Sequence, residues 1–334
     1  MASPEALKRR LEKTSQMVNE FIEKVLPPNY EAQLYQAARY QVFSGGKRLR
    51  PYLTIKSCEA AGGTANDALP LATATEILHN FTLIHDDVMD GDLLRRGKET
   101  VHVRFGEPMA ILSGDLLFAK VYQLVIDHAP PKMTNEEVLE ALGVLTDAAI
   151  QLCEGQALDV MFPQVVGVTE EDYFSMVGGK TAALFRACAQ LGAMAAGAPR
   201  EVVDSLGEFA WNSGLAFQIV DDVLGVTADE STLGKPRGSD IRERKKTLLL
   251  IHALRTAQGS DLETLKRLFD MESPSQEDVE SIIDVMDRLG AIQYAKDKAR
   301  HYLETALTKL GDLEPSPAKD QLAELVRYFV ERGY

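Results

Sequence analysis

The fold of this 334-residue chain is decided by the stretch Phe81-Thr82-Leu83-Ile84-His85-Asp86-Asp87-Val88-Met89-Asp90. An apolar run leads directly into three carboxylates. Asp86 and Asp90 are four residues apart, so on a helix they project from one face, about 6 Å apart at their Cβ atoms. Asp87 is turned about 100° away from that face and is expected to support it from behind. The stretch therefore predicts a largely buried helix that ends in a pair of carboxylates.

A second apolar run, Leu215 to Val220, leads into Asp221-Asp222-Val223-Leu224-Gly225. Ionised carboxylates beside a core are costly unless positive charge compensates them. Oxygen-rich sites of this kind favour hard divalent cations, and Mg²⁺ in particular. One acidic cluster alone is equally well explained as a solvated helix face. Two clusters that each end an apolar run favour two helices that line a carboxylate cavity inside a helical bundle.

Helical periodicity dominates the rest of the chain, and strand-type alternation is nearly absent. Glycine and proline pairs separate the helices, and Gly178-Gly179 inside a helical pattern predicts a kink. We expect an all-α protein, with residues 1–334 forming one domain built as a single large helical bundle around a central cavity. The expected helices are residues 4–24, 29–43, 51–61, 67–90, 108–128, 134–162, 170–196, 200–226, 246–256, 260–271, 275–287, 290–311 and 316–332.

Composition excludes several classes of protein. The net charge of −14 argues against binding to nucleic acid or to anionic membrane surfaces. The N-terminus has no apolar signal region, and residues 182–198 are interrupted by Arg186, so we expect a core helix there, no membrane span and a cytoplasmic location. The three cysteines are far apart in apolar surroundings, which favours reduced, buried thiols over a disulfide or zinc site.

Basic residues next to glycine recur beside the acidic clusters. Arginine forks and lysine ammonium groups suit phosphate, and glycine lets the backbone approach a ligand closely. In so acidic a chain, these segments together point to two polyphosphate groups, one bridged by metals and one held directly by cations. The segments are Gly45-Gly46-Lys47-Arg48-Leu49-Arg50-Pro51, Arg95-Arg96-Gly97, Lys180-Thr181, Gly234-Lys235-Pro236-Arg237-Gly238 and Lys245-Lys246-Thr247.

In order and spacing, the strings GGKRLRP, HDDVMD with RRG, GKT, FQIVDDVLG and GKPRGSDI resemble the trans-isoprenyl diphosphate synthases, and their short-chain, geranylgeranyl diphosphate synthase-like members in particular. The resemblance implies the helical bundle of the isoprenoid synthases and a prenyltransferase of isoprenoid biosynthesis. Isopentenyl diphosphate would condense head to tail with the cation formed from an allylic diphosphate, while three Mg²⁺ ions hold the leaving diphosphate. A homodimer is the usual assembly of that family.

The resemblance also implies roles for single residues. Asp86, Asp90 and Asp221 would be metal ligands, with Asp87 and Asp222 accessory. Thr181 and Gln218 would stabilise the developing cation through their oxygen dipoles. Contacts to the allylic diphosphate would come from Arg95, Lys180, Lys235 and Lys245, and contacts to isopentenyl diphosphate from Lys47, Arg50, His79 and Arg96. His79 is also compatible with an ordinary core histidine.

Two positions depart from the family's pattern. Gly225 stands where many relatives have a third aspartate. Asp229 or Asp240 would supply the missing negative charge from nearby. Arg244 stands where relatives often have glycine, which leaves open whether Lys245 or Lys246 contacts diphosphate.

Product length is expected to depend on the residues that precede Asp86. Phe81 lies five residues before it, about 7.5 Å along the helix, and would form the floor of the hydrocarbon pocket. Leu78 lies one turn further and Thr82 is small, a combination similar to archaeal-type synthases of a twenty-carbon product. A farnesyl or a longer-chain product is the alternative.

Three other functions stay open at this stage. A class I terpene cyclase would share the fold, but it would leave Lys47, Arg50 and Arg96 without a second diphosphate to bind. A non-catalytic partner subunit would be expected to lack the two aspartate clusters. An acidic helical scaffold would not bind a bisphosphonate in a Mg²⁺-dependent way.

Overall fold

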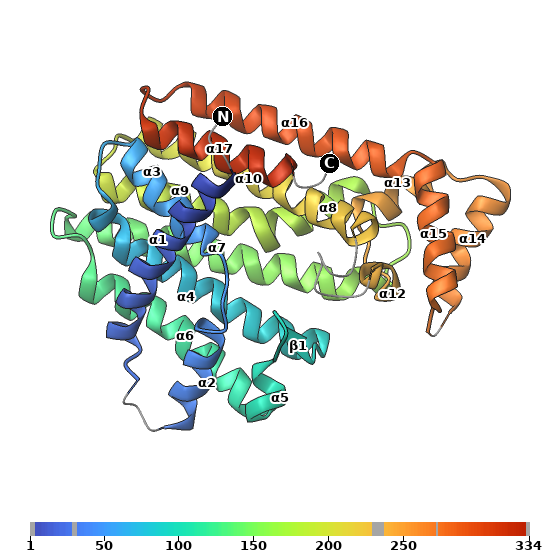
Figure 1. Cartoon of the computed structure of the whole chain (residues 1–334), viewed down its shortest axis with the longest axis horizontal. Coiled ribbons are helices and arrows are strands. Elements are labelled where there is room, and N and C mark those ends of the chain that lie inside the picture. Colours follow the sequence, from blue (N-terminus) through green and yellow to red (C-terminus); the bar gives the residue numbers. More distant parts are fainter. Residues whose placement is uncertain (1–3, 29–31, 229–236, 272, 332–334) are drawn as a thin grey trace. The chain divides into compact units, whose positions relative to one another are not determined.

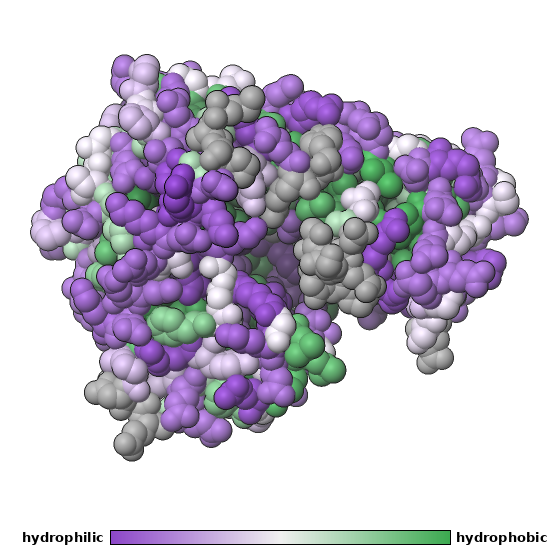
Figure 2. Space-filling view, in the orientation of Figure 1, coloured by the Kyte–Doolittle hydropathy of each residue, from purple (hydrophilic) through white to green (hydrophobic). Residues whose placement is uncertain are grey.

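The computed structural model describes residues 4–28, 32–228, 237–271 and 273–331. In these ranges the regular secondary structure is helical apart from one small antiparallel hairpin, β1 (Leu94–Arg95) with β2 (Lys98–Glu99), so the all-α prediction is confirmed (Figure 1). The hairpin was not predicted, because strands of two residues are too short to show alternation. Leu93 and Leu94 are largely exposed, and hydrophobic surface is visible at the place of β1 in Figure 2.

The helices follow the predicted order closely. They are α1 (Pro4–Val25), α2 (Gln33–Val42), α3 (Leu49–Ala60), α4 (Ala65–Asp90), α5 (Val101–Phe105), α6 (Glu107–His128), α7 (Asn135–Met161), α8 (Glu170–Val177), α9 (Ala183–Ala196), α10 (Arg200–Thr227), α12 (Ser239–Arg242), α13 (Leu248–Thr256), α14 (Gly259–Asp270), α15 (Gln276–Arg288), α16 (Ala291–Gly311) and α17 (Pro317–Glu331). The short helices α5 and α12 were missed, because one turn is too short to show a periodic pattern.

Local signals set where the helices that carry the motifs begin and end. Thr64 and Asp67 form a capping box at the start of α4, in which each side chain bonds the other residue's backbone N–H. At the other end, Gly91 adopts the left-handed conformation with φ 68°, which stops the helix. Asp86 and Asp90 therefore lie in the last turns of α4, at the negative end of the helix dipole. Carboxylates at that end need positive charge nearby.

The predicted kink at Gly178-Gly179 is a π-helical turn, Gly178–Ala182, between α8 and α9. Glycine is needed there because the backbones of α7 and this turn touch. A Cβ on Gly179 would lie 2.5 Å from the carbonyl oxygen of Gln151, and one on Gly155 would lie 2.2 Å from the backbone nitrogen of Lys180. The close approach places Lys180 and Thr181 beside α7.

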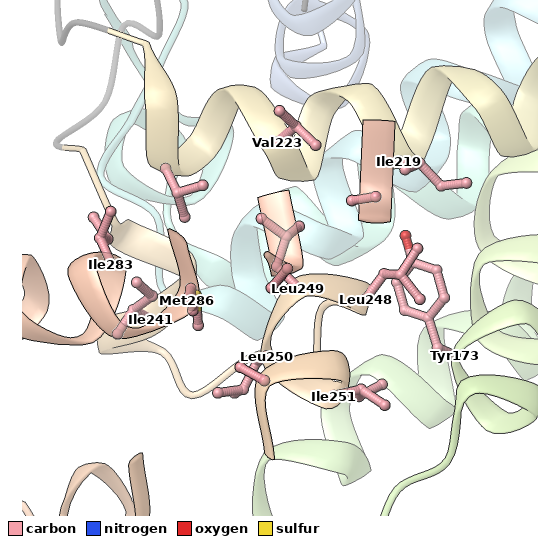
Figure 3. Close-up of a cluster of buried hydrophobic side chains, with 14 of the residues drawn as sticks. Tyr173, Ile219, Val223, Ile241, Leu248, Leu249, Leu250, Ile251, Ile283 and Met286 are labelled. Carbon is pink, nitrogen blue, oxygen red and sulfur yellow. The ribbon is translucent and has the colours of Figure 1, made fainter. Parts of the chain in front are cut away.

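The chain divides into two compact units. Unit 1 comprises residues 1–149, 184–210 and 309–325, and unit 2 comprises 150–183, 211–308 and 326–334. In unit 1, α4 packs against α3 and α6. In unit 2, Figure 3 shows side chains of α8, α10, α13 and α15 meeting in a buried hydrophobic cluster that includes Tyr173, Ile219 and Leu248. That residues 1–334 form one domain stays a prediction.

One described helix, α6, is long and apolar enough by composition to cross a membrane, although 39% of its most apolar window is buried. A core or interface helix of a soluble protein passes the same test, so this is weak support for a span. Ile111, Leu112 and Ile126 of α6 are exposed.

Candidate active site

The three aspartates of the first acidic cluster, in unit 1, differ in exposure as the helix period predicts. Asp87 is buried, and its Oδ1 accepts hydrogen bonds from Arg95 Nε and Nη2 at 2.6 and 2.5 Å. Burial raises the pKa of Asp87, although the Arg95 guanidinium opposes the shift. Asp86 is half-buried and Asp90 is exposed. The pair four residues apart thus stays accessible, while the third carboxylate anchors the hairpin that carries Arg95.

The basic residues predicted around the Gly45-Gly46 pair gather beside α4 in unit 1. Both glycines have a φ near +120°, and Arg96 donates to the carbonyl oxygen of Gly45. A Cβ on Gly46 would lie 2.8 Å from Arg96 Nη1, and the φ of +123° is itself strained for any residue but glycine. The structure thus brings Arg96 onto the loop that precedes Arg50.

His79 lies half-buried near these cations. Burial lowers the pKa of His79 well below its usual value, and the charges of Arg50 and Arg96 lower it further. It is therefore neutral at pH 7 and presents a hydrogen-bonding imidazole to a positively charged neighbourhood. A neutral donor among several cations suits an anionic ligand such as a diphosphate.

Arg48, which belongs to the same basic string, has a structural role. Its guanidinium is 3% exposed and donates to Glu76 Oε1 at 2.7 Å and to the Val42 carbonyl oxygen at 2.6 Å. Its backbone is left-handed, with φ 50°. Arg48 therefore fixes the loop that carries Lys47. The sequence pattern does not predict the pairing of Arg48 with Glu76, because the two residues are 28 positions apart.

The second acidic cluster lines a cavity of about 370 Å³ within unit 2. Its walls bring together side chains from α7, α8, the π-helical turn, α10 and the segment around α12. The lining includes the predicted Lys180, Thr181, Gln218, Asp221 and Lys245, together with Asp159, Tyr173, Asp222, Asp240 and Lys246. The gathering of acidic and basic side chains around one cavity is what a metal–diphosphate site requires.

Hydrogen bonds and an ion pair inside this cavity give its acidic side chains different roles. Lys180 Nζ pairs with Asp159 Oδ2 at 2.5 Å, a partner that the sequence did not indicate. Both oxygens of Asp222 are engaged: Tyr173 donates to Oδ2 at 2.8 Å and Gln218 donates to Oδ1 at 3.0 Å. Burial, and the nearby Asp240, raise the pKa of Asp222 to about 7. Asp221 is exposed, so it and not Asp222 is available to a metal ion.

The donors fit Mg²⁺ bound jointly with a phosphorylated substrate. Among the residues that the structure describes, no group of three or more histidine, cysteine or acidic side chains is arranged to hold a metal ion by itself. Mg²⁺ is commonly held by one or two carboxylates together with substrate phosphate oxygens. Asp86 with Asp90 in unit 1, and Asp221 in unit 2, are carboxylates of that kind.

Comparison with known proteins decides the family. Residues 31–286 match the family described as polyprenyl synthetase. The chain belongs to the polyprenyl synthetase family.

Relatives of this prenyltransferase of isoprenoid biosynthesis match along nearly its whole length. A protein of Methanosarcina mazei named geranylgeranyl diphosphate synthase is 40% identical over 96% of both chains. One of Aeropyrum pernix named geranylfarnesyl diphosphate synthase is 40% identical over 90% of this chain and 94% of its own. The crystal structure of geranylgeranyl pyrophosphate synthetase from Pyrococcus horikoshii superposes with a TM-score of 0.92 and 40% identity, covering 98% of this chain and 99% of that one.

The structure explains both departures from the polyprenyl synthetase pattern. Arg244 has φ 58°, the left-handed region in which glycine is the least strained residue. A Cβ at Gly225 would lie 3.0 Å from Asp240 Oδ2, so the glycine lets the Asp240 carboxylate come close to α10. Lys235 and Asp229, also named above, lie outside the described residues.

Of the two adjacent lysines, Lys245 is the better placed for an anion. It pairs with Glu243 at 2.9 Å and is partly exposed. Lys246 is 7% exposed and lies 3.6 Å from the centroid of the Phe269 ring. Burial lowers the pKa of Lys246 to about 8.

The residues assigned to product length lie along α4 in unit 1. Phe81 contacts the rings of His85 and Phe118, with centroids 4.8 and 5.1 Å away, and Phe118 contacts Tyr122 at 5.2 Å. Leu78 is 1% exposed, and the Thr82 hydroxyl donates to the His79 carbonyl oxygen at 2.8 Å. Phe81 is therefore the first of a row of aromatic rings between α4 and α6.

Proposed function

We propose that this chain catalyses the Mg²⁺-dependent head-to-tail condensation of isopentenyl diphosphate with allylic diphosphates, and that its product is all-trans geranylgeranyl diphosphate. The observation that carries the proposal is the pairing of two aspartate clusters with two sets of cations, in a chain of a prenyltransferase family. Relatives named geranylgeranyl diphosphate synthase favour the twenty-carbon product over the alternatives.

The residues divide between binding and charge stabilisation. Asp86 and Asp90 in unit 1, and Asp221 in unit 2, would hold Mg²⁺, which when bound neutralises charge on a leaving diphosphate. Lys180 and Lys245 line the unit 2 cavity and would bind the allylic diphosphate there. Arg95, in unit 1, stays a proposed diphosphate contact. Lys47, Arg50, His79 and Arg96 bind isopentenyl diphosphate.

Bond breaking creates an allylic cation and a diphosphate anion, so positive groups held ready for the anion lower the barrier. Thr181 and Gln218 face the same cavity with oxygen atoms that stabilise the cation. C4 of isopentenyl diphosphate attacks the cation, and a proton is then lost to the released diphosphate. No protein nucleophile takes part.

The test is incubation with isopentenyl diphosphate and each allylic primer in turn, with Mg²⁺, followed by chain-length measurement of the products. We expect elongation to twenty carbons. No elongation with any primer would contradict a synthase, and a hydrocarbon released without isopentenyl diphosphate would indicate a cyclase instead.

We further propose that two copies of the chain associate through α6. Its exposed Ile111, Leu112 and Ile126 form an apolar surface on a helix with few charges, which a second copy would cover. Sedimentation should give twice the mass of one chain, and Ile126→Glu should shift the mass toward one chain. A single-chain mass for the unaltered protein would exclude this dimer.

A further inference from the structure

We propose that Tyr173 is a positioning residue for the step that forms the allylic cation: it holds Asp222, which in turn turns the amide oxygen of Gln218 toward the cavity. The proposal rests on the synthase activity proposed above. It concerns a residue that the sequence motifs do not contain, since Tyr173 lies seven positions before Lys180.

A chain of three hydrogen bonds carries the inference. Tyr173 donates its hydroxyl to Asp222 Oδ2 at 2.8 Å, and Gln218 Nε2 donates to Asp222 Oδ1 at 3.0 Å. Thr181 donates its hydroxyl to Gln218 Oε1 at 2.9 Å. All four side chains line the same cavity, and all but Gln218 are buried.

The direction of the chain follows from which atoms can donate. The NH₂ group of Gln218 donates to Asp222, which leaves its carbonyl oxygen as the acceptor for the Thr181 hydroxyl. Because Tyr173 occupies the second oxygen of Asp222, the carboxylate has no freedom to rotate away. Without Tyr173, the amide of Gln218 would lose its fixed orientation, and its NH₂ group could turn toward the cation.

The same chain makes Asp222 useful without a metal ion. It fixes the amide of Gln218, whose carbonyl oxygen carries a partial negative charge beside Thr181 in the cavity lining. In a poorly solvated cavity, such a charge stabilises a developing cation more than it would in water. A neutral substrate tail gains nothing from it, so the effect belongs to the transition state.

Tyr173 is well suited to hold a fixed position. It lies on α8, directly after the helix start that Thr169 and Asp172 cap, and its side chain is fully buried. Figure 3 shows its ring packed by Leu248, with the hydroxyl directed toward α10, the helix that carries Ile219 and Val223. The neighbouring Phe174 ring meets it edge-on, with centroids 5.3 Å apart.

The first experiment compares Tyr173→Phe, which removes one hydroxyl, with the unaltered enzyme. We expect kcat to fall about tenfold while KM for both diphosphates changes less than about twofold, the pattern of a contact made only in the transition state. Tyr302→Phe is the matched control, because Tyr302 packs against the same cluster through Phe174 and should leave both constants unchanged.

The second experiment separates positioning from mere structural support. An amine analogue of the allylic cation, bound with Mg²⁺ and pyrophosphate, should bind Tyr173→Phe about tenfold more weakly, whereas an uncharged analogue of the same shape should bind equally well. In a Gln218→Met background, Tyr173→Phe should have no further effect on amine binding, because it acts through Gln218.

Equal losses for the charged and uncharged analogues, or additive losses in the double variant, would overturn the inference. So would an unchanged kcat in Tyr173→Phe. If the unaltered enzyme elongates no primer, the proposed function fails instead, which is a separate and prior result.

Discussion

At the scale of single residues, identical side chains acquire different tasks from their places on one helix. Asp86, Asp87 and Asp90 share the end of α4, yet Asp87 is buried and accepts hydrogen bonds from Arg95, while Asp90 is exposed. The same holds for the basic string, where Arg48 is buried against Glu76 while Lys47 is exposed. A motif therefore names the candidates, and burial decides which of them can meet a ligand.

Phe81→Ala should lengthen the product beyond twenty carbons, because it removes the first ring of the row that Phe118 and Tyr122 continue. The measurement is chain-length analysis of the products with one allylic primer. Phe105→Ala, which removes a ring that contacts Tyr40 on α2, serves as the control and should leave the length unchanged. An unaltered product from Phe81→Ala would show that Phe81 is not the floor.

Glu76→Gln should destabilise the protein strongly, by about 3 kcal/mol, since it leaves the buried guanidinium of Arg48 without its counter-charge. Because Arg48 fixes the loop that carries Lys47, KM for isopentenyl diphosphate should also rise. Urea unfolding and steady-state kinetics measure the two effects. Glu324→Gln breaks the more exposed pair with Arg10 and should cost less than about 1 kcal/mol. Equal costs for the two variants would contradict this reading of Arg48.

At the scale of elements, the site depends on where helices start, stop and touch. Gly91 ends α4 one residue after Asp90, and Gly155 and Gly179 allow the backbone of α7 to approach the π-helical turn that carries Lys180. Capping boxes begin α4, α8 and α15. Small residues and helix caps thus set where the backbone runs, and the backbone in turn sets the positions of the charged side chains.

Thr169→Ala should lower the stability of the protein by about 1 kcal/mol, because the first turn of α8 loses its cap. Thr308→Ala, at an exposed position inside α16, is the control and should change stability little. Both are measured by urea unfolding at pH 7. Equal losses in the two variants would argue against a capping role.

The capping contribution should also depend on pH in a defined direction. Hydrogen bonds from Thr169 lower the pKa of Asp172 below its usual 3.8. The stability from this carboxylate is therefore fully present above pH 4 and is lost as pH falls through the lowered pKa. The stability difference between the unaltered protein and Asp172→Asn should shrink below pH 4, and a difference that stays constant down to pH 2 would exclude the effect.

At the scale of the whole molecule, the −14 net charge coexists with local concentrations of positive charge. The neutral His79 among arginines in unit 1, and the lysines of the unit 2 cavity, are the places where an acidic protein can accept diphosphates. We expect the acidic clusters beside them to supply metal ligands. Binding should therefore be cooperative between metal and anion, since neither is complete alone.

Removal of divalent metal with a chelator should abolish elongation, and added Mg²⁺ should restore it, because the described carboxylates need an ion to hold a diphosphate. A bisphosphonate should raise the melting temperature only when Mg²⁺ is present. Asp90→Asn should reduce that shift, whereas Asp312→Asn, at an exposed position after α16, should not. A shift of the same size without metal would contradict the proposed site.

The sequence by itself determined the helical class, the shared face of Asp86 and Asp90, the distortion at Gly178-Gly179 and the family, because each follows from helix period, backbone freedom or local order of residues. Only the tertiary structure decided which distant side chains pair. These hydrogen-bonded or ion-paired residues are Arg95 with Asp87, Arg48 with Glu76, Lys180 with Asp159, and Tyr173 with Asp222. These pairs are between 8 and 49 residues apart, and no local period relates them. Which distant side chains meet depends on how the helices pack, since packing sets burial, and burial sets which charges must find a partner.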